Sequence, residues 1–371
     1  ATPQAIAALR YFYEETPELP VVAAGSLLEF ALSDHSFSMP VGRIEYLHLS
    51  PVTFTEYLRE ADPIVQDYLQ EFRIGAQFPE AAHRKLLVRQ REFLVYGGMP
   101  EVIQAAADGA DFPEIRRLQR SIVETFRDDF AKYAAQTQLV RLQILFDSLP
   151  RWVGRKVIYS KMLPETPSGT VRAHLDLLMK AELCRPVYHS DASGVPLGAQ
   201  IDRNVYKLLM VDVGLMTMMN GLDWPAIQKL DTRTLVNEGS LAEQFVGQHL
   251  AAALENTPER GLYYWLREKK RSNAEVDFLL SRGGAIIPIE VKAGRSGTLK
   301  SLHQFVYQKR LTTALRFDLN PPSEQVVETG LVPPGSSDTG SASALVRYRL
   351  ISLPLYFSGE LPRLLEALDY R

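Results

Sequence analysis

Residues 274–292 are the most informative part of the sequence for the C-terminal fold, and they read Ala-Glu-Val-Asp-Phe-Leu-Leu-Ser-Arg-Gly-Gly-Ala-Ile-Ile-Pro-Ile-Glu-Val-Lys. Their two apolar segments predict β-strands at about 275–280 and 285–291. A spacing of two places Glu290 and Lys292 on one face of the second strand. Because charged groups are costly to bury without partners, Asp277, Glu290 and Lys292 predict a site rather than a plain core.

Two carboxylates and a lysine in this pattern suit a metal site that handles phosphate. Asp277 and Glu290 offer the hard oxygen ligands that Mg²⁺ prefers, and Lys292 can orient a water molecule or stabilise charge on a phosphate. A structural alternative is that Glu290 and Lys292 form a cross-strand or surface ion pair, while Asp277 caps or salt-bridges a neighbour. The residues by themselves leave both alternatives open.

The elements around this stretch predict a compact mixed unit. A helix begins near Ser240, strands follow at 261–266, 275–280 and 285–291, and a helix at 298–309 precedes a strand near Ala314. The predicted order is therefore α-β-β-β-α-β.

Residues 238–320 resemble the PD-(D/E)xK phosphodiesterases, which have the restriction-endonuclease-like fold. The resemblance implies that Asp277 and Glu290 are metal ligands and that Lys292 is the catalytic lysine. It also implies that Glu243 is the helix-borne acid and a third ligand, with Mg²⁺ as the cofactor. One departure is that Glu275-Val276, rather than a proline, precedes Asp277. Nuclease-like domains can keep these acids and lose the activity, so the fold and the catalysis are separate expectations.

Basic residues are concentrated around the predicted site. Between 267 and 300 there are eight basic residues, at 267, 269, 270, 271, 282, 292, 295 and 300, against four acids. A basic rim suits a phosphodiester backbone, and we expect Lys269, Lys270 and Arg271 to contact DNA. The alternative is a solvated loop at 267–271.

The hydrophobic pattern of the N-terminal 52 residues predicts part of an α/β domain. Helices are expected at 3–15 and 27–32, and strands at 19–25 and 44–49. The segment at 21–29 resembles the sensor-1 strand of AAA+ P-loop ATPases, with Ser26 facing the γ-phosphate or the attacking water. Arg43 lies where such proteins hold an arginine finger. The alternatives are a helix N-cap serine and a surface arginine.

Further motifs extend this resemblance to the whole chain. They are Leu-Ser-Pro-Val-Thr-Phe-Thr-Glu-Tyr at 49–57, Tyr-Gly-Gly-Met-Pro-Glu at 96–101, Phe-Arg-Asp-Asp-Phe-Ala-Lys-Tyr at 126–133 and Val-Asp-Val-Gly-Leu at 211–215. As a series they resemble the bacterial and archaeal ATP-binding family that ends in the domain of unknown function 4143. The chain contains no Gly-x4-Gly-Lys-[Ser/Thr], so the loop that cradles phosphates is missing. We expect a fragment whose fuller form binds ATP, although processing of an N-terminal methionine is an alternative.

The middle of the chain predicts helices and then a winged helix. Residues 53–135 are helical except at 97–100, and three short helices precede a hairpin at 183–189 and 199–207. The long helix expected from Ser168 to Ala181 places Arg172, His174 and Lys180 on its outer side. Arg172 and Lys180 are candidates for DNA contacts, while Asp176 and the acidic chain favour a protein–protein or inter-domain role.

Composition sets the remaining limits. The 371 residues are 46% hydrophobic and 23% charged, with a net charge of −3 and one cysteine. A single cysteine excludes an intramolecular disulfide and a multi-Cys zinc site. No apolar run reaches about 18 residues, so no membrane span is expected, and the cytoplasm is the expected compartment.

The predicted fold class is α/β plus α, divided into four parts. Residues 1–52 form the C-terminal remnant of an AAA+ core, 53–137 a helical lid, 138–222 a winged-helix-like unit, and 223–371 the nuclease-like domain. The predicted function is metal-dependent cleavage of DNA by a nuclease domain within an ATP-binding protein. A homo-oligomer is one of the quaternary structures compatible with the sequence. The alternative is a regulatory ATPase whose nuclease-like domain serves only for docking.

Overall fold

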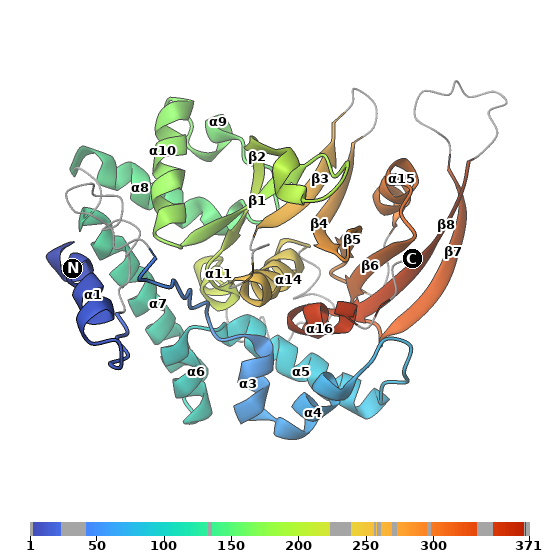
Figure 1. Ribbon diagram of the computed structural model, residues 1–371, viewed down its shortest axis with the longest axis horizontal. Helices are drawn as coiled ribbons and strands as arrows, with labels where there is room; N and C mark the ends of the chain where they lie inside the picture. The colour runs from blue at the N-terminus through green and yellow to red at the C-terminus, as the bar shows by residue number, and fades with distance from the viewer. Residues whose placement is uncertain are drawn as a thin grey trace.

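The computed structural model describes residues 3–23, 42–132, 136–222, 239–255, 257, 261–268, 273–294, 298–331, 344–366 and 368. These residues form an eight-stranded mixed sheet with helices packed around it (Figure 1). Helix α1 and the β7–β8 hairpin lie at opposite ends of the long axis of the molecule. Among the described helices, none is both long enough and apolar enough to cross a bilayer.

The N-terminal segment does not form the predicted strands. After helix α1 (Pro3–Glu15), the described residues 19–23 and 44–49 have no strand structure. Their apolar side chains face solvent, and Val22 and Leu49 are each 92% exposed. A strand requires a hydrogen-bonded neighbour, and none of the described strands pairs with either segment. The two strand predictions were therefore wrong for these residues, and the helix predicted at 27–32 lies outside the described residues.

The helical prediction for residues 53–135 is confirmed for most of the described part. It was wrong for residues 72–79 and 108–111, which are turns and loops between helices, because only a break at 97–100 was predicted. The helices are α3 (Phe54–Ala61), α4 (Pro63–Glu71), α5 (Glu80–Tyr96), α6 (Pro100–Ala107), α7 (Phe112–Asp129) and the 3-10 turn η1 (Phe130–Lys132). Helix α3 starts with a capping box between Thr53 and Glu56. The predicted break at 97–100 is fixed by Gly97, which has φ +73° and approaches Asp212 so closely that a Cβ would lie 2.1 Å from Oδ1.

The next segment has the predicted helices and hairpin. Its elements are α8 (Gln136–Ser148), η2 (Leu149–Arg151), α9 (Tyr159–Met162), α10 (Ser168–Lys180), β1 (Cys184–Ser190), η3 (Leu197–Gln200), β2 (Ile201–Met210) and α11 (Val213–Met219). Strands β1 and β2 are antiparallel. Helix α10 buries the predicted face, since Val171, Leu175 and Leu178 are at most 1% exposed.

The C-terminal part follows the predicted α-β-β-β-α-β order and then adds further elements. The six are α14 (Gly239–Leu254), β3 (Leu262–Arg267), β4 (Ala274–Arg282), β5 (Ala285–Val291), α15 (Lys300–Lys309) and β6 (Thr313–Asp318). The additional elements are β7 (Ser323–Leu331), β8 (Ala344–Pro354), η4 (Leu355–Glu360) and α16 (Leu361–Glu366).

The sheet runs across segments that the sequence analysis assigned to different units. Its strand order is β2-β1-β3-β4-β5-β6-β8-β7. Strand β1 pairs in parallel with β3, with Val187 opposite Leu262. The β1–β2 hairpin, which the sequence predicts as the wing of a winged helix, therefore extends the C-terminal sheet at one edge.

The two faces of the sheet carry different cores. Phe245 of α14 belongs to the core that contains Phe278 and Ile289, whereas Phe305 of α15 belongs to the core that contains Val276 and Leu279. Helix α14 approaches the sheet closely through Gly247, where a Cβ would lie 2.4 Å from Leu209 Cδ1 and 2.9 Å from Phe278 Cζ. This close approach brings the polar side chains of α14 next to β2 and β4.

Candidate functional site

The candidate site is built on an irregularity in β4. Tyr263 of β3 lies opposite Leu279, but Trp265 lies opposite Val276, so β4 has one extra residue at 277–278. A β-bulge of this kind redirects side chains from the regular alternation. Val276 and Leu279 belong to the core on the α15 side, and Phe278 belongs to the core on the α14 side.

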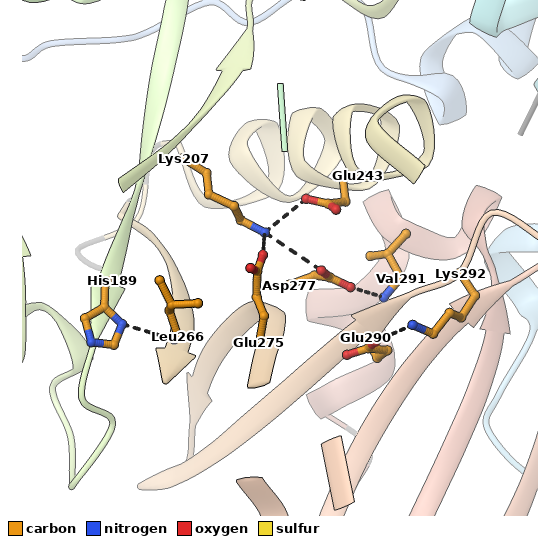
Figure 2. A network of polar contacts seen from close by, with 9 residues as sticks. All are labelled: His189, Lys207, Glu243, Leu266, Glu275, Asp277, Glu290, Val291 and Lys292. Carbon is orange, nitrogen blue, oxygen red and sulfur yellow. Dashed lines mark hydrogen bonds and ion pairs between the residues drawn. The ribbon is translucent and has the colours of Figure 1, made fainter. Parts of the chain in front are cut away.

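Asp277 also points to the α14 side, toward a buried lysine from β2. The ammonium of Lys207 donates to Glu243 Oε2 at 3.0 Å and to Glu275 Oε1 at 2.8 Å, and it lies 3.8 Å from Asp277 Oδ1 (Figure 2). Three carboxylates from α14 and β4 thus converge on one ammonium. The sequence analysis predicted two of them, Glu243 and Asp277.

Lys207 is the functional candidate that the sequence analysis missed. It is 1% exposed and follows Tyr206 in a strand that continues with Leu-Leu-Met. Lysine is almost never fully buried unless it is paired with an acid. A lysine inside an apolar strand was therefore the available signal, but the sequence does not indicate which acids would face it.

Glu290 and Lys292 form a second group on the neighbouring strand. Lys292 Nζ donates to Glu290 Oε1, as the shared face of the strand predicts. On β5, Ile289 packs in the core on the α14 side and Ile286 packs in the core on the α15 side, so the alternation directs Glu290 away from α14. The two groups are linked by the N–H of Val291, which donates to Asp277 Oδ2 at 2.7 Å.

Burial and mutual repulsion perturb these acids strongly. Burial raises the pKa of Glu243 to about 8, against the opposing effect of the Lys207 ammonium. Burial, together with the nearby charge of Asp277, likewise raises the pKa of Glu290 to about 8. Burial also raises the pKa of Asp277, while Lys207 and the Val291 N–H oppose that rise. Burial lowers the pKa of Lys207, but Glu243, Asp277 and Glu275 outweigh it and the pKa lies above its ordinary value.

A divalent cation fits the chemistry of these donors, although the arrangement is not a preformed metal site. Among the described residues, no three His, Cys, Asp or Glu side chains are placed to hold one ion. The predicted ligands Glu243, Asp277 and Glu290 therefore do not share one coordination point here. However, Glu290 Oε2 is buried without a hydrogen-bond partner, and three carboxylates already surround the Lys207 ammonium. Oxygen donors with surplus negative charge are the type that Mg²⁺ or Mn²⁺ binds.

The structure places the predicted residues of α10 on different sides of the helix. Arg172 and Lys180 are exposed, as predicted, and Arg172 Nη1 donates to Asn204 Oδ1 at 3.2 Å. His174 is 2% exposed and its Nδ1 donates to the Thr170 carbonyl at 2.6 Å. The prediction that His174 lies on the outer side was wrong, because it lies three residues from Val171 and so on the same helical face.

Other predicted residues lie apart from the site or outside the described chain. Arg43 pairs with Glu14 of α1, with Nη2 2.9 Å from Oε1. Ser26 and the basic residues Lys269, Lys270 and Arg271 fall outside the described residues.

Comparisons with known families match two regions of the chain. Residues 88–226 match a domain of unknown function (DUF8612), and residues 238–332 match a domain of unknown function (DUF4143). No curated protein and no solved structure matches the chain. Lys207 lies in the first matched region, and Glu243, Asp277 and Glu290 lie in the second. The predicted DUF4143 resemblance is thereby confirmed for residues 238–332, the region that the family model matches.

Proposed function

We propose that the unit formed by α14, β3–β6 and α15 is a nuclease-like domain that cleaves phosphodiester bonds in DNA with the help of a divalent cation. The observation that carries the proposal is the bulge at 277–278, where Asp277 faces the Lys207 ammonium that also contacts Glu243, on the strand next to the Glu290–Lys292 pair. Bulges are frequent next to active sites because they aim a side chain that regular pleating would direct elsewhere.

Each polar residue has a defined part in this proposal. Glu243, Asp277 and Glu290, which do not share one coordination point in this structure, would have to draw together to hold Mg²⁺ or Mn²⁺. A cation bound there supplies Lewis acidity and lowers the pKa of a bound water. Lys292 is 25% exposed at its side chain, so its ammonium can reach a phosphate oxygen and stabilise the charge that develops on it.

Basic residues outside the acidic cluster would bind the DNA backbone. Arg172 and Lys180 are exposed on α10, and Lys269, Lys270 and Arg271 belong to the segment between β3 and β4. Such contacts supply sequence-independent affinity. The resemblance to AAA+ proteins supports a link between this domain and ATP binding in the cytoplasm, although the sequence contains no Gly-x4-Gly-Lys-[Ser/Thr].

A second candidate function is favoured by Lys207. Its ammonium already neutralises part of the charge on Glu243, Glu275 and Asp277 without a metal ion. A cluster balanced in this way can be a structural ion-pair network. The C-terminal domain would then be a docking module without catalysis.

The test is a comparison of metal binding with nicking of supercoiled plasmid DNA in Mg²⁺ and Mn²⁺. We expect Asp277→Asn and Glu290→Gln to lose both Mn²⁺ affinity and nicking, because each removes a charged oxygen donor. Lys292→Ala should keep Mn²⁺ affinity and lose nicking. Glu328→Gln is a matched control, since Glu328 is 53% exposed on β7 and pairs with Arg347.

The docking alternative predicts a different result. Wild-type protein that binds no divalent ion and nicks no plasmid in any divalent salt would contradict the nuclease proposal. The same three substitutions would then change only the free energy of unfolding.

A further inference from the structure

Lys207 reaches the acidic cluster from outside the DUF4143 domain. It lies on β2, within the region that matches DUF8612, whereas its carboxylate partners lie on α14 and β4. The pairing of β1 with β3 brings this hairpin to the edge of the C-terminal sheet. The polar cluster is therefore composite, and residues 238–332 by themselves lack its central cation.

The ammonium of Lys207 is enclosed on several sides. It lies 5.0 Å from the ring centroid of Tyr264 and 5.9 Å from that of Phe278. Gly154 covers Glu243 so closely that a Cβ there would lie 2.9 Å from Oε2. Residue Lys156 of the same segment bridges to Lys207 through its backbone. The lysine thus belongs to the packed interior and is not a surface side chain that happens to reach the acids.

The carboxylates that would bind a cation are the ones that Lys207 contacts. Glu243 Oε2 accepts a hydrogen bond from the ammonium, and Asp277 Oδ1 faces it at 3.8 Å. A divalent ion between these oxygens would lie within a few ångströms of a positive charge, and like charges at that distance in a buried site repel strongly. The ammonium and a metal ion therefore cannot both occupy this position.

Glu275 gives the lysine an alternative partner. It makes the shortest contact with the ammonium, at 2.8 Å, and its side chain is 37% exposed, compared with 16% for Glu243 and 13% for Asp277. Lys207 can keep this hydrogen bond near the surface while it releases the two deeper carboxylates. This hydrogen bond is therefore the one that the ammonium would keep if a cation bound the two deeper carboxylates.

We propose that Lys207 is a built-in counter-ion that competes with a divalent cation for Glu243 and Asp277. Through it, a strand of the DUF8612 region sets the metal affinity of the DUF4143 domain. This inference rests on the proposed metal-dependent function of the same site.

The test measures Mn²⁺ binding to the full chain by calorimetry and by the shift in melting temperature. Lys207→Met and Lys207→Gln remove the competing charge, and we expect each to bind Mn²⁺ about tenfold more tightly than wild type. Lys207→Arg keeps the charge and should bind Mn²⁺ as weakly as wild type. Adding Asp277→Asn to Lys207→Gln should abolish the gain.

The outcomes separate this inference from the proposed function. If wild type binds Mn²⁺ and the two neutral variants bind it no more tightly, Lys207 does not compete and the inference fails while the metal site stands. If the neutral variants bind more tightly but no variant nicks DNA, the inference stands and the nuclease proposal fails. Neutral variants that unfold in EDTA but fold in Mn²⁺ support the inference, because the metal then replaces the ammonium. Neutral variants that stay unfolded in EDTA and in Mn²⁺ alike would overturn the inference. So would folded neutral variants that, like wild type, bind no Mn²⁺.

Discussion

At the scale of single residues, His249 shows how a buried polar group joins distant segments. It lies on α14, is 1% exposed, and its Nδ1 donates to the Phe245 carbonyl at 2.7 Å. Its Nε2 therefore carries no proton, and it accepts the N–H of Phe54 at the start of α3, at 2.8 Å. The neutral ring satisfies a backbone donor that would otherwise be buried without a partner.

This arrangement predicts a pH dependence of stability. Burial lowers the pKa of His249 from 6.5 to about 4, so between these values the unfolded state binds a proton that the folded state does not. The free energy of unfolding should therefore fall as the pH drops from 6.5 toward 4. Urea unfolding should show wild type losing about 2 kcal/mol between pH 6.5 and 5 relative to His249→Gln, which does not titrate.

The matched control for this measurement is His48→Gln, because His48 is 21% exposed at its side chain and lies outside the core. Its stability should follow wild type at every pH. If His249→Gln and wild type give parallel curves from pH 7 to 5, the buried neutral histidine does not control acid stability.

At the scale of elements, the position of α14 decides the geometry of the candidate site. Gly247 lets the helix approach Leu209 and Phe278, one turn after Glu243 on the same helix. Gln244 fixes the helix to β2 because its amide exchanges two hydrogen bonds of 2.8 Å with the backbone of Met210. A change in the height of α14 above the sheet would therefore move Glu243 relative to Lys207.

Gly247→Ala should separate helix and sheet. The added Cβ meets two packed side chains, and we expect the free energy of unfolding to fall by about 1–3 kcal/mol. Gly239→Ala is the control at the start of α14, where a Cβ meets no atom within 4 Å. Urea denaturation of both variants checks this, and equal stabilities would show that α14 does not pack as closely as described.

At the scale of the whole molecule, the sheet and a shared core join the two matched regions. One core contains Phe54 of α3, Val187 of β1, Phe245 of α14 and Ile351 of β8. The pairing of β1 with β3 adds backbone hydrogen bonds across the same boundary. A core without a division between the regions favours cooperative unfolding.

We therefore expect one unfolding transition, with far-UV circular dichroism and tryptophan fluorescence giving the same midpoint. Val187→Ala, at a position that is fully buried on β1, should lower that midpoint for both probes and cost about 2 kcal/mol. Two transitions, with only one shifted by the substitution, would mean that the regions unfold independently.

Local patterns in the amino-acid sequence were enough to predict several elements. Hydrophobic periodicity predicted the buried face of α10, the hairpin after it and the α-β-β-β-α-β order from α14 to β6. The spacing of two in a strand predicted that Glu290 and Lys292 share one face, and the ion pair between them was the structural alternative to a site. These predictions succeeded because residues three or four apart in a helix, and two apart in a strand, share a face in any fold.

Contacts between residues far apart in the sequence could be seen only in the folded molecule. The segments at 19–23 and 44–49 are apolar enough for strands, but a strand forms only where a partner pairs with it. The bulge at 277–278 interrupts the regular alternation of side chains along β4, so alternation alone does not determine on which side of the sheet Asp277 lies. Lys207 lies 70 residues before Asp277, and its contacts with Glu243, Glu275 and Asp277 depend on β1 pairing with β3 and on α14 packing against both. Long-range pairing and helix packing are set by the sum of many contacts, so no short stretch of the chain encodes them.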